Sequence, residues 1–461
     1  MHKSSHLSIV ILAAGQGSRM KSELPKVLHP LGGKPLLQHV VDTASELRPK
    51  QIIVVYGHGG EMVPESIHGE NLIWKKQSEQ LGTGHAVEQA IPLLTDDETI
   101  LVLYGDVPLV KTDTLAELVR LGDEGFGLLS VHLDNPAGYG RIERDKHGAV
   151  KRIVEEKDAT DEIKKITEVN TGILCCGAKK MRQWIRKLEN NNAQGEFYLT
   201  DTIEMSVNNS ITVKATHPAS VVEVTGVNSR NQLAQLERAY QTIQANKLME
   251  NGVSLLDPAR LDIRGKIITG QDVSIDINVI LQGEVTIGNN VQIGAGCVIS
   301  DTQINDNVVI KPMSVIEQSI IGQNSIVGPF TRLRPGADLA DSAHVGNFVE
   351  IKNSKIGSAS KVNHLSYIGD TTMGEDVNIG AGTITCNYDG ANKHRTVIGD
   401  KVFIGSDSQL VAPVEVGDGA TIGAGTTLTS NASVNDLTLS RIKQKTIKGW
   451  KRPIKKGTSD E

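Results

Sequence analysis

A glycine-rich segment with two cations follows the first apolar run of the chain. In LAAGQGSRM (12–20), Gly15 and Gly17 come just after that run, and Arg19 and then Lys26 of LPK follow them. Glycines let main-chain N–H groups approach phosphate oxygens closely, and two cations can offset the charge of a triphosphate. The spacing also fits a strand-to-helix turn without chemistry. The segment is therefore a candidate phosphate-binding loop.

Two further side chains could carry chemistry. Asp106 directly follows an apolar run in YGDVPL, where its carboxylate could reach a Mg²⁺ ion bridging phosphates. His364, in VNHLSY, could act as a general base near neutral pH. A lone Asp in such a place more often caps a helix, and a single His in a repetitive segment is more often a surface side chain. The residues alone leave both choices open.

The first part of the chain alternates short apolar runs with amphipathic helical patterns. The runs are 7–14, 51–57 and 99–106, and the helical patterns between them are 35–47 and 84–94. This alternation predicts an α/β domain of Rossmann-like type, with a mostly parallel sheet and helices on both faces. Ligands bind at the carboxyl ends of the strands in such sheets. Both the glycine-rich segment and Asp106 fall there.

A change of period predicts the domain boundaries. Between Asn228 and Gly252, apolar residues recur at three-, four- and five-residue steps among polar ones, which predicts one long α-helix. We therefore expect a first domain over 1–229, a helical linker over 230–252 and a second domain over 253–461. At 461 residues, the chain is too long for one core.

The second domain carries a six-residue aliphatic repeat, which is typical of a parallel β-helix with three flat faces to each coil. Glycine often follows the aliphatic position, where we expect the chain to turn a corner. The stretch TCNYDGANKHRT (385–396) interrupts the repeat and predicts a loop on one face. The repeat positions are Ile275, Leu281, Ile287, Ile293, Ile299, Ile304, Ile310, Ile316, Ile321, Val327, Leu333, Ile356, Val362, Ile368, Ile398, Ile404, Leu410, Val416, Ile422 and Leu428.

Composition excludes several classes of protein. A net charge of -6 does not fit a nucleic-acid-binding protein, which carries a basic excess. The four Cys show neither a disulfide framework nor a zinc spacing, which suggests a reducing compartment. No apolar run reaches the roughly 20 residues of a membrane span, and 7–14 fits a buried strand better than a signal peptide. We expect a soluble, cytoplasmic protein without nucleic-acid or membrane partners.

The motifs taken together resemble a known family. LxxGxGxRM, LPK, QLGTGHA, YGDVPL, GYGRI, VEEKDA, NTGI and GVNSR occur in order, and the hexad half matches equally closely. The chain resembles the bifunctional enzymes that join an N-acetylglucosamine-1-phosphate uridyltransferase to a left-handed β-helix glucosamine-1-phosphate acetyltransferase. The resemblance covers the whole chain. It implies synthesis of UDP-N-acetylglucosamine, a precursor for peptidoglycan and lipopolysaccharide, from glucosamine-1-phosphate, acetyl-CoA and UTP, with Mg²⁺ and N-acetylglucosamine-1-phosphate as the intermediate.

The resemblance also implies the residues of a uridyl-transfer site. Asp106 and Asn228 match Mg²⁺ ligands, and Arg19 and Lys26 match phosphate contacts. Gln16 and Ser18 depart from the commonest loop, which has Lys and Thr there. The positions that match binding of UTP or UDP-N-acetylglucosamine are Leu12, Ala13, Gly15, Arg19, Lys26, Gln77, Gly82, Thr83, Tyr104, Gly105, Asp106, Gly140, Glu155, Asn170 and Asn228, the sugar falling on Gly140, Glu155 and Asn170.

The acetyl-transfer residues implied by the resemblance lie in the hexad half. His364 matches the catalytic base and Glu350 the acidic residue that orients it. The positions for glucosamine-1-phosphate are Arg334, Lys352, Tyr367, Asn378, Asn387 and Tyr388, and those for acetyl-CoA are Ala381, Asn387, Tyr388, Ser406, Ala424 and Arg441. The family forms trimers with acetyl sites between adjacent β-helices, which implies a homotrimer.

Three alternatives remain at this point. A non-catalytic exchange-factor subunit also joins a nucleotidyltransferase-like domain to a β-helix, but it need not keep Arg19, Lys26, Asp106 and His364. A pyrophosphorylase for another sugar could carry a regulatory β-helix, against which the NYDG and HLSY motifs argue. The basic tail at 443–456 could be a solvated terminus, or it could hold CoA phosphates or a neighbouring subunit.

Overall fold

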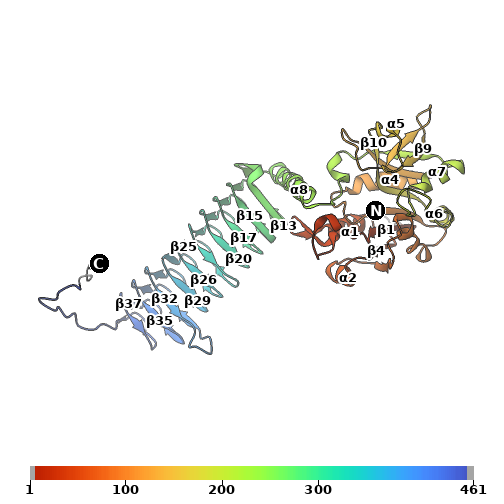
Figure 1. Cartoon of the computed structure of the whole chain (residues 1–461). Coiled ribbons are helices and arrows are strands. Elements are labelled where there is room, and N and C mark those ends of the chain that lie inside the picture. The colour runs from red at the N-terminus through yellow and green to blue at the C-terminus, as the bar shows by residue number, and fades with distance from the viewer. Residues whose placement is uncertain (1–5, 454–461) are drawn as a thin grey trace, which may run out of the picture. The chain divides into compact units, whose positions relative to one another are not determined.

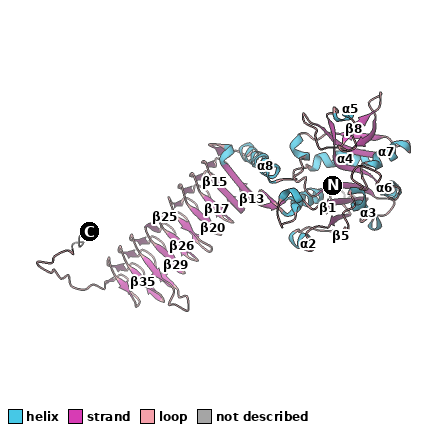
Figure 2. Ribbon diagram, in the orientation of Figure 1, coloured by secondary structure: helices cyan, strands magenta, loops and turns pink. Residues whose placement is uncertain are grey.

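The computed structural model describes residues 6–453 and divides the chain into two compact units (Figures 1 and 2). One unit comprises the residues up to Asn246 together with Ile263–Gly265. The other comprises Lys247–Asp262 and everything from Lys266 onward. Residues 1–5 of the predicted uridyltransferase domain, and residues 454–461, which include the last residues of the basic tail, lie outside the described residues.

A nine-stranded sheet forms the centre of the first unit, in the order β11-β7-β10-β6-β1-β4-β5, with β8 and β9 paired beside β10. Strands β1, β4, β5 and β6 run parallel, as the alternation predicted. The strands are β1 Leu7–Ala13, β4 Gln51–Tyr56, β5 Leu72–Lys76, β6 Thr99–Tyr104, β7 Phe126–His132, β8 Arg141–Arg144, β9 Val150–Val154, β10 Glu168–Gly177 and β11 Val213–Thr216, and the separate pair is β2 Pro30–Leu31 with β3 Lys34–Pro35.

Helices cover both faces of this sheet because successive residues of each strand point to opposite faces. Ile9 and Ile11 of β1 pack with α1 and α4 in one core, whereas Val10 and Leu12 pack with α3, α6 and α7 in the other. The helices are α1 Leu36–Glu46, α2 Met62–Ser66, α3 Thr83–Glu88, α4 Thr112–Asp123, α5 Asp161–Lys164, α6 Ala178–Ile185, α7 Asp201–Asn208 and α8 Arg230–Glu250, and the short 3₁₀ turns are η1 Ser18–Met20, η2 Lys26–Leu28, η3 Ile91–Leu93, η4 Val221–Val224 and η5 Pro258–Arg260.

One strand departs from the parallel arrangement. β10 runs antiparallel to both β6 and β7, because the β8–β9 hairpin, rather than a crossover helix, lies between β7 and β10 in the chain. β11 then pairs parallel to β7. The amino end of β10 therefore lies at the same edge of the sheet as the carboxyl ends of β6 and β7.

The long helix predicted between the two domains is α8, but it is not a free linker. Leu236 and Tyr240 are 3% and 9% exposed and pack with Met20, Leu31 and Leu36. The ring of Tyr240 lies so close to Gly32 that a Cβ there would be 2.1 Å from a ring carbon. Most of α8 thus belongs to the first unit and supports the segment that carries Lys26.

The second unit is a stack of β-coils in which strands pair in parallel with the coils before and after. Side chains that form hydrogen bonds between neighbouring coils can be 17 or 18 residues apart, as in Asn289 with Asp306 and Gln323 with Asp341. One sheet contains β12 Ser254–Leu255, β14 Ser274–Ile275, β16 Gln292–Ile293, β19 Val309–Ile310, β22 Ile326–Val327, β25 His344–Asn347, β28 Lys361–His364, β31 Asn378–Ile379, β34 Phe403–Ile404, β37 Thr421–Ile422 and β39 Leu437–Thr438.

A second sheet of 17 strands wraps the other faces of the stack. Its strands are β13 Leu261–Thr269, β15 Val279–Ile287, β17 Val298–Ser300, β18 Gln303–Ile304, β20 Val315–Glu317, β21 Ile320–Ile321, β23 Arg332–Leu333, β24 Asp338–Leu339, β26 Glu350–Lys352, β27 Lys355–Ile356, β29 Tyr367–Gly369, β30 Thr371–Met373, β32 Ile384–Cys386, β33 Thr396–Ile398, β35 Gln409–Val411, β36 Val414–Val416 and β38 Thr427–Leu428.

The hexad prediction is confirmed at every aliphatic position named for it, since each of those side chains is at most 3% exposed. The predicted loop is also present. β32 ends at Cys386 and β33 begins at Thr396, so the intervening residues form an extra excursion from one coil. The aliphatic stack explains how so large a unit forms a core with few aromatic residues.

The reason expected for the repeated glycines was wrong. The left-handed residue of each corner lies two positions after the glycine, as at Asn290 after Gly288 and at Asp407 after Gly405. The glycines themselves lie against the next coil. A Cβ at Gly288 would be 2.8 Å from the main chain of Asn305 and one at Gly405 2.4 Å from the main-chain nitrogen of Ala424. Close stacking of the coils, rather than a special φ, requires glycine there.

Candidate functional site

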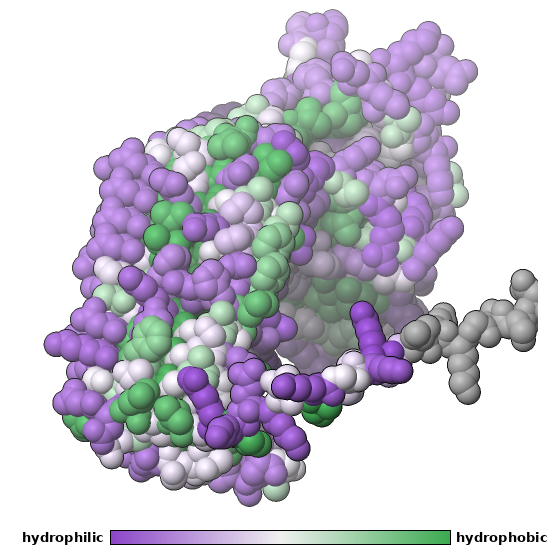
Figure 3. All heavy atoms as spheres, turned by 90° about the vertical axis from the view of Figure 1, so that its left-hand side faces the viewer, coloured by the Kyte–Doolittle hydropathy of each residue, from purple (hydrophilic) through white to green (hydrophobic). Residues whose placement is uncertain are grey.

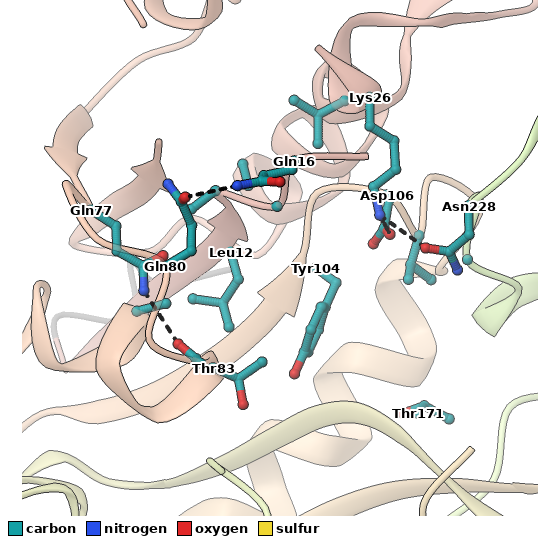
Figure 4. Close-up of a pocket in the computed structure, with 18 of the residues that line it drawn as sticks. Leu12, Gln16, Lys26, Gln77, Gln80, Thr83, Tyr104, Asp106, Thr171 and Asn228 are labelled. Carbon is teal, nitrogen blue, oxygen red and sulfur yellow. Dashed lines mark hydrogen bonds and ion pairs between the residues drawn. The ribbon is translucent and has the colours of Figure 1, made fainter. Parts of the chain in front are cut away.

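A cavity of about 640 Å³ opens at the carboxyl ends of β1 and β6, a size typical of a small-molecule site (Figure 4). The glycine-rich segment, α3 and the residues just before α8 close its sides. The lining residues are Leu12, Ala13, Ala14, Gly15, Gln16, Lys26, Val27, Gln77, Gln80, Gly82, Thr83, Ala86, Tyr104, Asp106, Val107, Tyr139, Thr171, Glu196, Val224, Gly226 and Asn228.

One cation and two side-chain oxygens meet at one end of this cavity. The Lys26 ammonium contacts the carboxylate of Asp106 and lies 3.1 Å from Oδ1 of Asn228 (Figure 4). The side chains of Lys26 and Asp106 are only 13% and 14% exposed. Asp106 and Asn228 come from segments far apart in sequence, yet their oxygens converge on a single positive charge.

The remaining predicted residues of the first unit lie around the cavity rather than in its lining. Gly105 is packed beneath it, where a Cβ would be 3.1 to 3.3 Å from Leu37, Ala13 and Val27. Arg19 is exposed on the 3₁₀ turn η1. Gly140, Glu155 and Asn170, which were expected to contact the sugar, form a group of their own beyond Tyr104.

The group beyond Tyr104 is held by main-chain and side-chain contacts. The Asn170 N–H donates to the carbonyl of Gly140 at 2.8 Å, and a Cβ at Gly140 would be 3.3 Å from the carboxylate of Glu155. Thr200 Oγ1 donates to Glu155 Oε1 at 2.9 Å. Burial raises the pKa of Glu155, and burial with the charges of Glu155 and Asp106 raises the pKa of Tyr104. The phenol therefore stays neutral between two carboxylates.

A buried arginine fixes the strands that carry these residues. Arg141 is 2% exposed, donates to the carbonyl of Tyr139, and places Nη2 2.8 Å from Oε2 of Glu156. Because Arg141 opens β8 and Glu156 follows β9, this ion pair holds Gly140 and Glu155 side by side. Arg141 had been quoted only as part of GYGRI.

Sequence reasoning missed several residues that line the cavity. Gln80 lies in the quoted motif QLGTGHA, and its Oε1 is 3.5 Å from Nε2 of Gln16. Tyr139 and Thr171 stand next to the named Gly140 and Asn170 in GYGRI and NTGI, so the motifs contained a signal for them. Glu196 comes from the connection after α6 and had no motif around it.

In the second unit, His364 ends β28 and is exposed. Its Nδ1 lies 3.2 Å from Oδ1 of Asn347, which is the residue paired with it on the preceding coil. An amide oxygen only accepts, so in this hydrogen bond Nδ1 is the donor, and in the neutral ring the lone pair is then on Nε2. Glu350, expected to orient this imidazole, instead accepts a hydrogen bond from Arg334 at 2.8 Å.

His364 belongs to a column that continues over the following coils. On each coil, the N–H of the residue that follows a column member donates to the carbonyl of the column member on the preceding coil. Gly382 donates in this way to His364, Asp407 to Ala381 and Gly425 to Ser406. The His364 column consists of Asn347, His364, Ala381, Ser406 and Ala424. Three of the residues expected to bind acetyl-CoA therefore lie in line with the expected base, and Arg441 reaches the end of this line, beside Gly423.

Glycines border the column because the coils stack closely there. Gly380 and Gly405 precede Ala381 and Ser406, and a Cβ at Gly380 would be 2.5 Å from the main-chain nitrogen of Ser406. Asn378 lies on the same sheet, in β31, paired with Lys361 of the strand that bears His364.

The other residues expected to bind the sugar phosphate, and the extra loop, lie around the next corner of the same coils. Glu350 pairs with Tyr367 in register on the 17-stranded sheet. The ammonium of Lys393 in the loop lowers the pKa of Lys352, which places two cations close together. Tyr388, also in the loop, is exposed and donates to the Gly390 carbonyl at 2.6 Å.

A buried carboxylate secures the base of the extra loop. Asp370 is 8% exposed and accepts hydrogen bonds of 2.5 Å from Asn353 and Asn387. Burial opposes ionisation of Asp370, but these two hydrogen bonds, with the charges of Lys352 and Lys393, outweigh it and lower its pKa. Asn387 is thus 8% exposed and held by Asp370.

An apolar corner separates the His364 column from the residues expected to bind the sugar phosphate other than Asn378. Met313, Phe330, Phe348 and Leu365 occupy one corner of successive coils, are 52 to 64% exposed, and all have φ between 49° and 61°. The Phe330 and Phe348 rings stack with centroids 5.4 Å apart. Figure 3 shows apolar side chains gathered on the surface of the coils. Bulky residues rarely adopt such φ values, so their position calls for an explanation.

The fold and these two sites define a transferase with a nucleotidyltransferase domain followed by a hexapeptide-repeat domain. Residues 9–192 match the MobA-like NTP transferase domain, 263–346 the GMPPB C-terminal domain, and 395–430 the bacterial transferase hexapeptide model with six repeats. The bifunctional protein GlmU of Azoarcus sp. (strain BH72) is 57% identical over 450 residues, which cover 97% of this chain and 100% of that protein. The chain belongs to the GlmU family, and it is a bifunctional enzyme with a left-handed β-helix as its second unit.

Among residues 6–453, no helix has the length and apolar character needed to cross a bilayer.

Proposed function

We propose that the cavity of the first unit transfers uridyl from UTP to N-acetylglucosamine-1-phosphate, and that the surface around His364 transfers acetyl from acetyl-CoA to glucosamine-1-phosphate. Together the two reactions make UDP-N-acetylglucosamine. The observation that carries the first assignment is the convergence of Asp106, Asn228 and Lys26 at the end of a nucleotide-sized cavity. For the second it is the alignment of the His364 column.

In uridyl transfer, the chain binds and orients rather than forming a covalent intermediate. The main chain at Gly15 and the amide of Gln77 face the nucleotide, and Gly140, Glu155 and Asn170 face the sugar beyond Tyr104. Arg19 and Lys26 offset phosphate charge. The sugar-phosphate oxygen then attacks the α-phosphorus in line, and pyrophosphate leaves.

The residues present fit a Mg²⁺ ion. A carboxylate and an amide oxygen already converge on one cation, and oxygen donors of this kind suit Mg²⁺. Asp106 and Asn228 would hold the ion, which when bound neutralises phosphate charge. Lys26 uses the same two oxygens, so it must release them, and the triphosphate offers it new anionic partners.

Replacing Lys26 with methionine is therefore expected to tighten Mn²⁺ binding in the absence of nucleotide. The ammonium competes for Asp106 and Asn228, and a hydrogen bond to a charged group contributes about 1.5 to 3 kcal/mol, so the affinity should rise about tenfold or more. Electron paramagnetic resonance of free Mn²⁺ measures this directly. Arg19→Met is the matched control, because Arg19 is exposed in the same loop. Unchanged or weaker Mn²⁺ binding by Lys26→Met would contradict the competition.

In acetyl transfer, His364 is the general base. The amine of glucosamine-1-phosphate must present a lone pair to the thioester carbonyl, and Nε2 of His364 is free to take a proton while Asn347 holds Nδ1. Arg334, Lys352 and Tyr367 would face the sugar phosphate, with Asn378, Asn387 and Tyr388 completing its surroundings. Acetyl-CoA would extend along Ala381, Ser406 and Ala424 toward Arg441.

We also propose that the enzyme is a homotrimer in which a second copy covers the apolar corner. The expected acetyl-site residues lie on both sides of Leu365, so a chain packed there would complete the site. The left-handed φ values of Phe330 and Phe348 would then be offset by burial of their rings.

The domain proposal keeps 1–229 as the uridyltransferase domain, 230–252 as the helix and 253–461 as the acetyltransferase domain. A chain ending at Glu250 is expected to retain uridyl transfer, lose acetyl transfer and sediment as a monomer. A chain ending at Ser229 should be far less stable, because it lacks Leu236 and Tyr240, and deleting a buried Leu alone costs about 2 to 5 kcal/mol.

Sedimentation velocity and pyrophosphate release test both chains beside the full-length enzyme. A folded 1–250 chain without pyrophosphate release would contradict the modular proposal. A monomeric full-length enzyme would contradict the trimer.

A further inference from the structure

Two histidines and a glutamate meet at the edge of the first sheet, on three neighbouring strands. His132 is the last residue of β7 and pairs in register with Glu168, the first residue of β10. His217 directly follows β11, whose Thr216 pairs with Leu129 of β7. A ring nitrogen of each His and a carboxylate oxygen of Glu168 all lie within 4.8 Å of one another.

We propose that His132, Glu168 and His217 form a binding site for one divalent transition-metal ion, for which Zn²⁺ is the probe. Imidazole nitrogens suit Zn²⁺, Ni²⁺ and Cu²⁺, whereas Mg²⁺ prefers oxygen. Two nitrogens and one oxygen would leave a position open to water, as in three-ligand zinc sites. The site is separate from Asp106 and Asn228 and does not depend on the uridyl-transfer assignment.

Hydrogen bonds around the cluster orient its side chains as a supporting shell orients metal ligands. Nδ1 of His217 donates to the carbonyl of Ser130 at 2.9 Å, so Nε2 of that ring keeps a lone pair. Nδ1 of His132 lies 3.4 Å from Oγ1 of Thr167. Both histidines are exposed, so an ion can reach them from solvent, and their rings are 5.4 Å apart.

Glu168 is fixed and ionised. It is 6% exposed, and its oxygens accept hydrogen bonds of 2.7 Å from Ser130 and from two nitrogens of Arg144. Burial opposes ionisation, but Arg144 and Ser130 outweigh it and lower the pKa of Glu168. A carboxylate offers about four lone-pair positions, and these bonds use three, which leaves one on Oε2.

Arg144 influences how tightly the site can bind a metal ion. Its positive charge repels a divalent ion, so the affinity should be lower than that of a buried structural zinc site. Binding also requires both imidazoles to be neutral, so it should weaken in acid. An ion bound here would join β7, β10 and β11, and because it binds only the folded chain, it should raise the melting temperature.

The test measures Zn²⁺ binding to the metal-stripped, full-length protein without nucleotide, by isothermal titration calorimetry. His132→Ala and His217→Ala should each lower the affinity of one Zn²⁺ site by about 100-fold or more, since loss even of a supporting residue costs about 10- to 100-fold. His147→Ala is the matched control, because His147 is exposed on the nearby β8–β9 turn and outside the cluster. Zinc should raise the melting temperature of wild type and His147→Ala, but not of the two cluster variants.

Zn²⁺ that binds at the cavity could be mistaken for Zn²⁺ bound at the proposed site. The Asp106→Ala variant removes binding at the cavity and should keep the His132–Glu168–His217 site. In the Asp106→Ala chain, Co²⁺ should give a visible absorption band that disappears on His132→Ala or His217→Ala. Equal Zn²⁺ affinity in wild type and both histidine variants would overturn the proposal. So would a loss in only one of them, which would mean a single surface imidazole and not a shared site.

Discussion

Replacing His364 with alanine is expected to lower the turnover of acetyl transfer by roughly 10² to 10⁴, the usual contribution of a positioned general base. Without the imidazole, no group at this place in the column takes the proton as the amine attacks the thioester. The measurement is CoA thiol release from acetyl-CoA at saturating glucosamine-1-phosphate. Uridyl transfer in the same preparation is the internal control and should stay within a small factor.

Substitutions of residues near His364 provide comparisons for this experiment. Asn347→Ala should cost less than His364→Ala in the same step, because Asn347 only positions Nδ1. Glu350→Gln should also cost less, and it should act mainly on the Michaelis constant for glucosamine-1-phosphate, since Glu350 contacts Arg334 rather than the imidazole. If His364→Ala changed only the Michaelis constant and left turnover intact, His364 would be a binding residue, and Tyr367 would be the next candidate base.

Replacing Asp106 with alanine is expected to abolish uridyl transfer to within detection while acetyl transfer persists. A bound metal contributes several kcal/mol of charge stabilisation in such reactions, and each 1.4 kcal/mol or so is a factor of ten, so a loss of about a thousandfold or more follows. Pyrophosphate release over a Mg²⁺ titration measures it. Additional Mg²⁺ should not restore the rate, because the carboxylate is gone.

A second substitution of Asp106 tests whether its negative charge, and not only its size, is required. Asp106→Asn preserves the volume and can still accept a hydrogen bond from Lys26, but it removes the negative charge that attracts the ion. It should therefore lose nearly as much activity as Asp106→Ala. Near-normal uridyl transfer by either variant, with an unchanged dependence on Mg²⁺, would remove Asp106 from the metal site.

Local sequence patterns predicted those parts of the fold in which apolar residues recur at a regular spacing along the chain. The aliphatic hexads predicted a buried ladder because each coil repeats the same packing, and Ile404, Leu410 and Ile422 are indeed buried. The direction of β10 was not predictable in this way, since an apolar run looks the same in either orientation. The role of Gly405 was misjudged because its constraint comes from Ala424 on the next coil, not from its own backbone.

The candidate site residues could be predicted where they belong to a recognisable sequence motif. Lys26, Asp106 and Asn228 stand in three separate motifs, and the structure brings Asp106 and Asn228 within hydrogen-bonding distance of Lys26. Glu196 could not be found, because only folding brings the connection after α6 to the cavity. Asn347 was missed although it lies one coil before His364, and the coil length would have pointed to it.

Because the coils are stacked in a line, the second unit is expected to unfold progressively from one end. Each coil is in contact only with the coils next to it, so its stability is approximately a sum of nearest-neighbour terms, and the stack can fray from a free end. Ala424 lies nearer the last strand, β39, than His364 does. Mild heating would then erode the outer part of the proposed CoA surface while the histidine was still held, and acetyl-CoA affinity would fall before the catalytic group was lost.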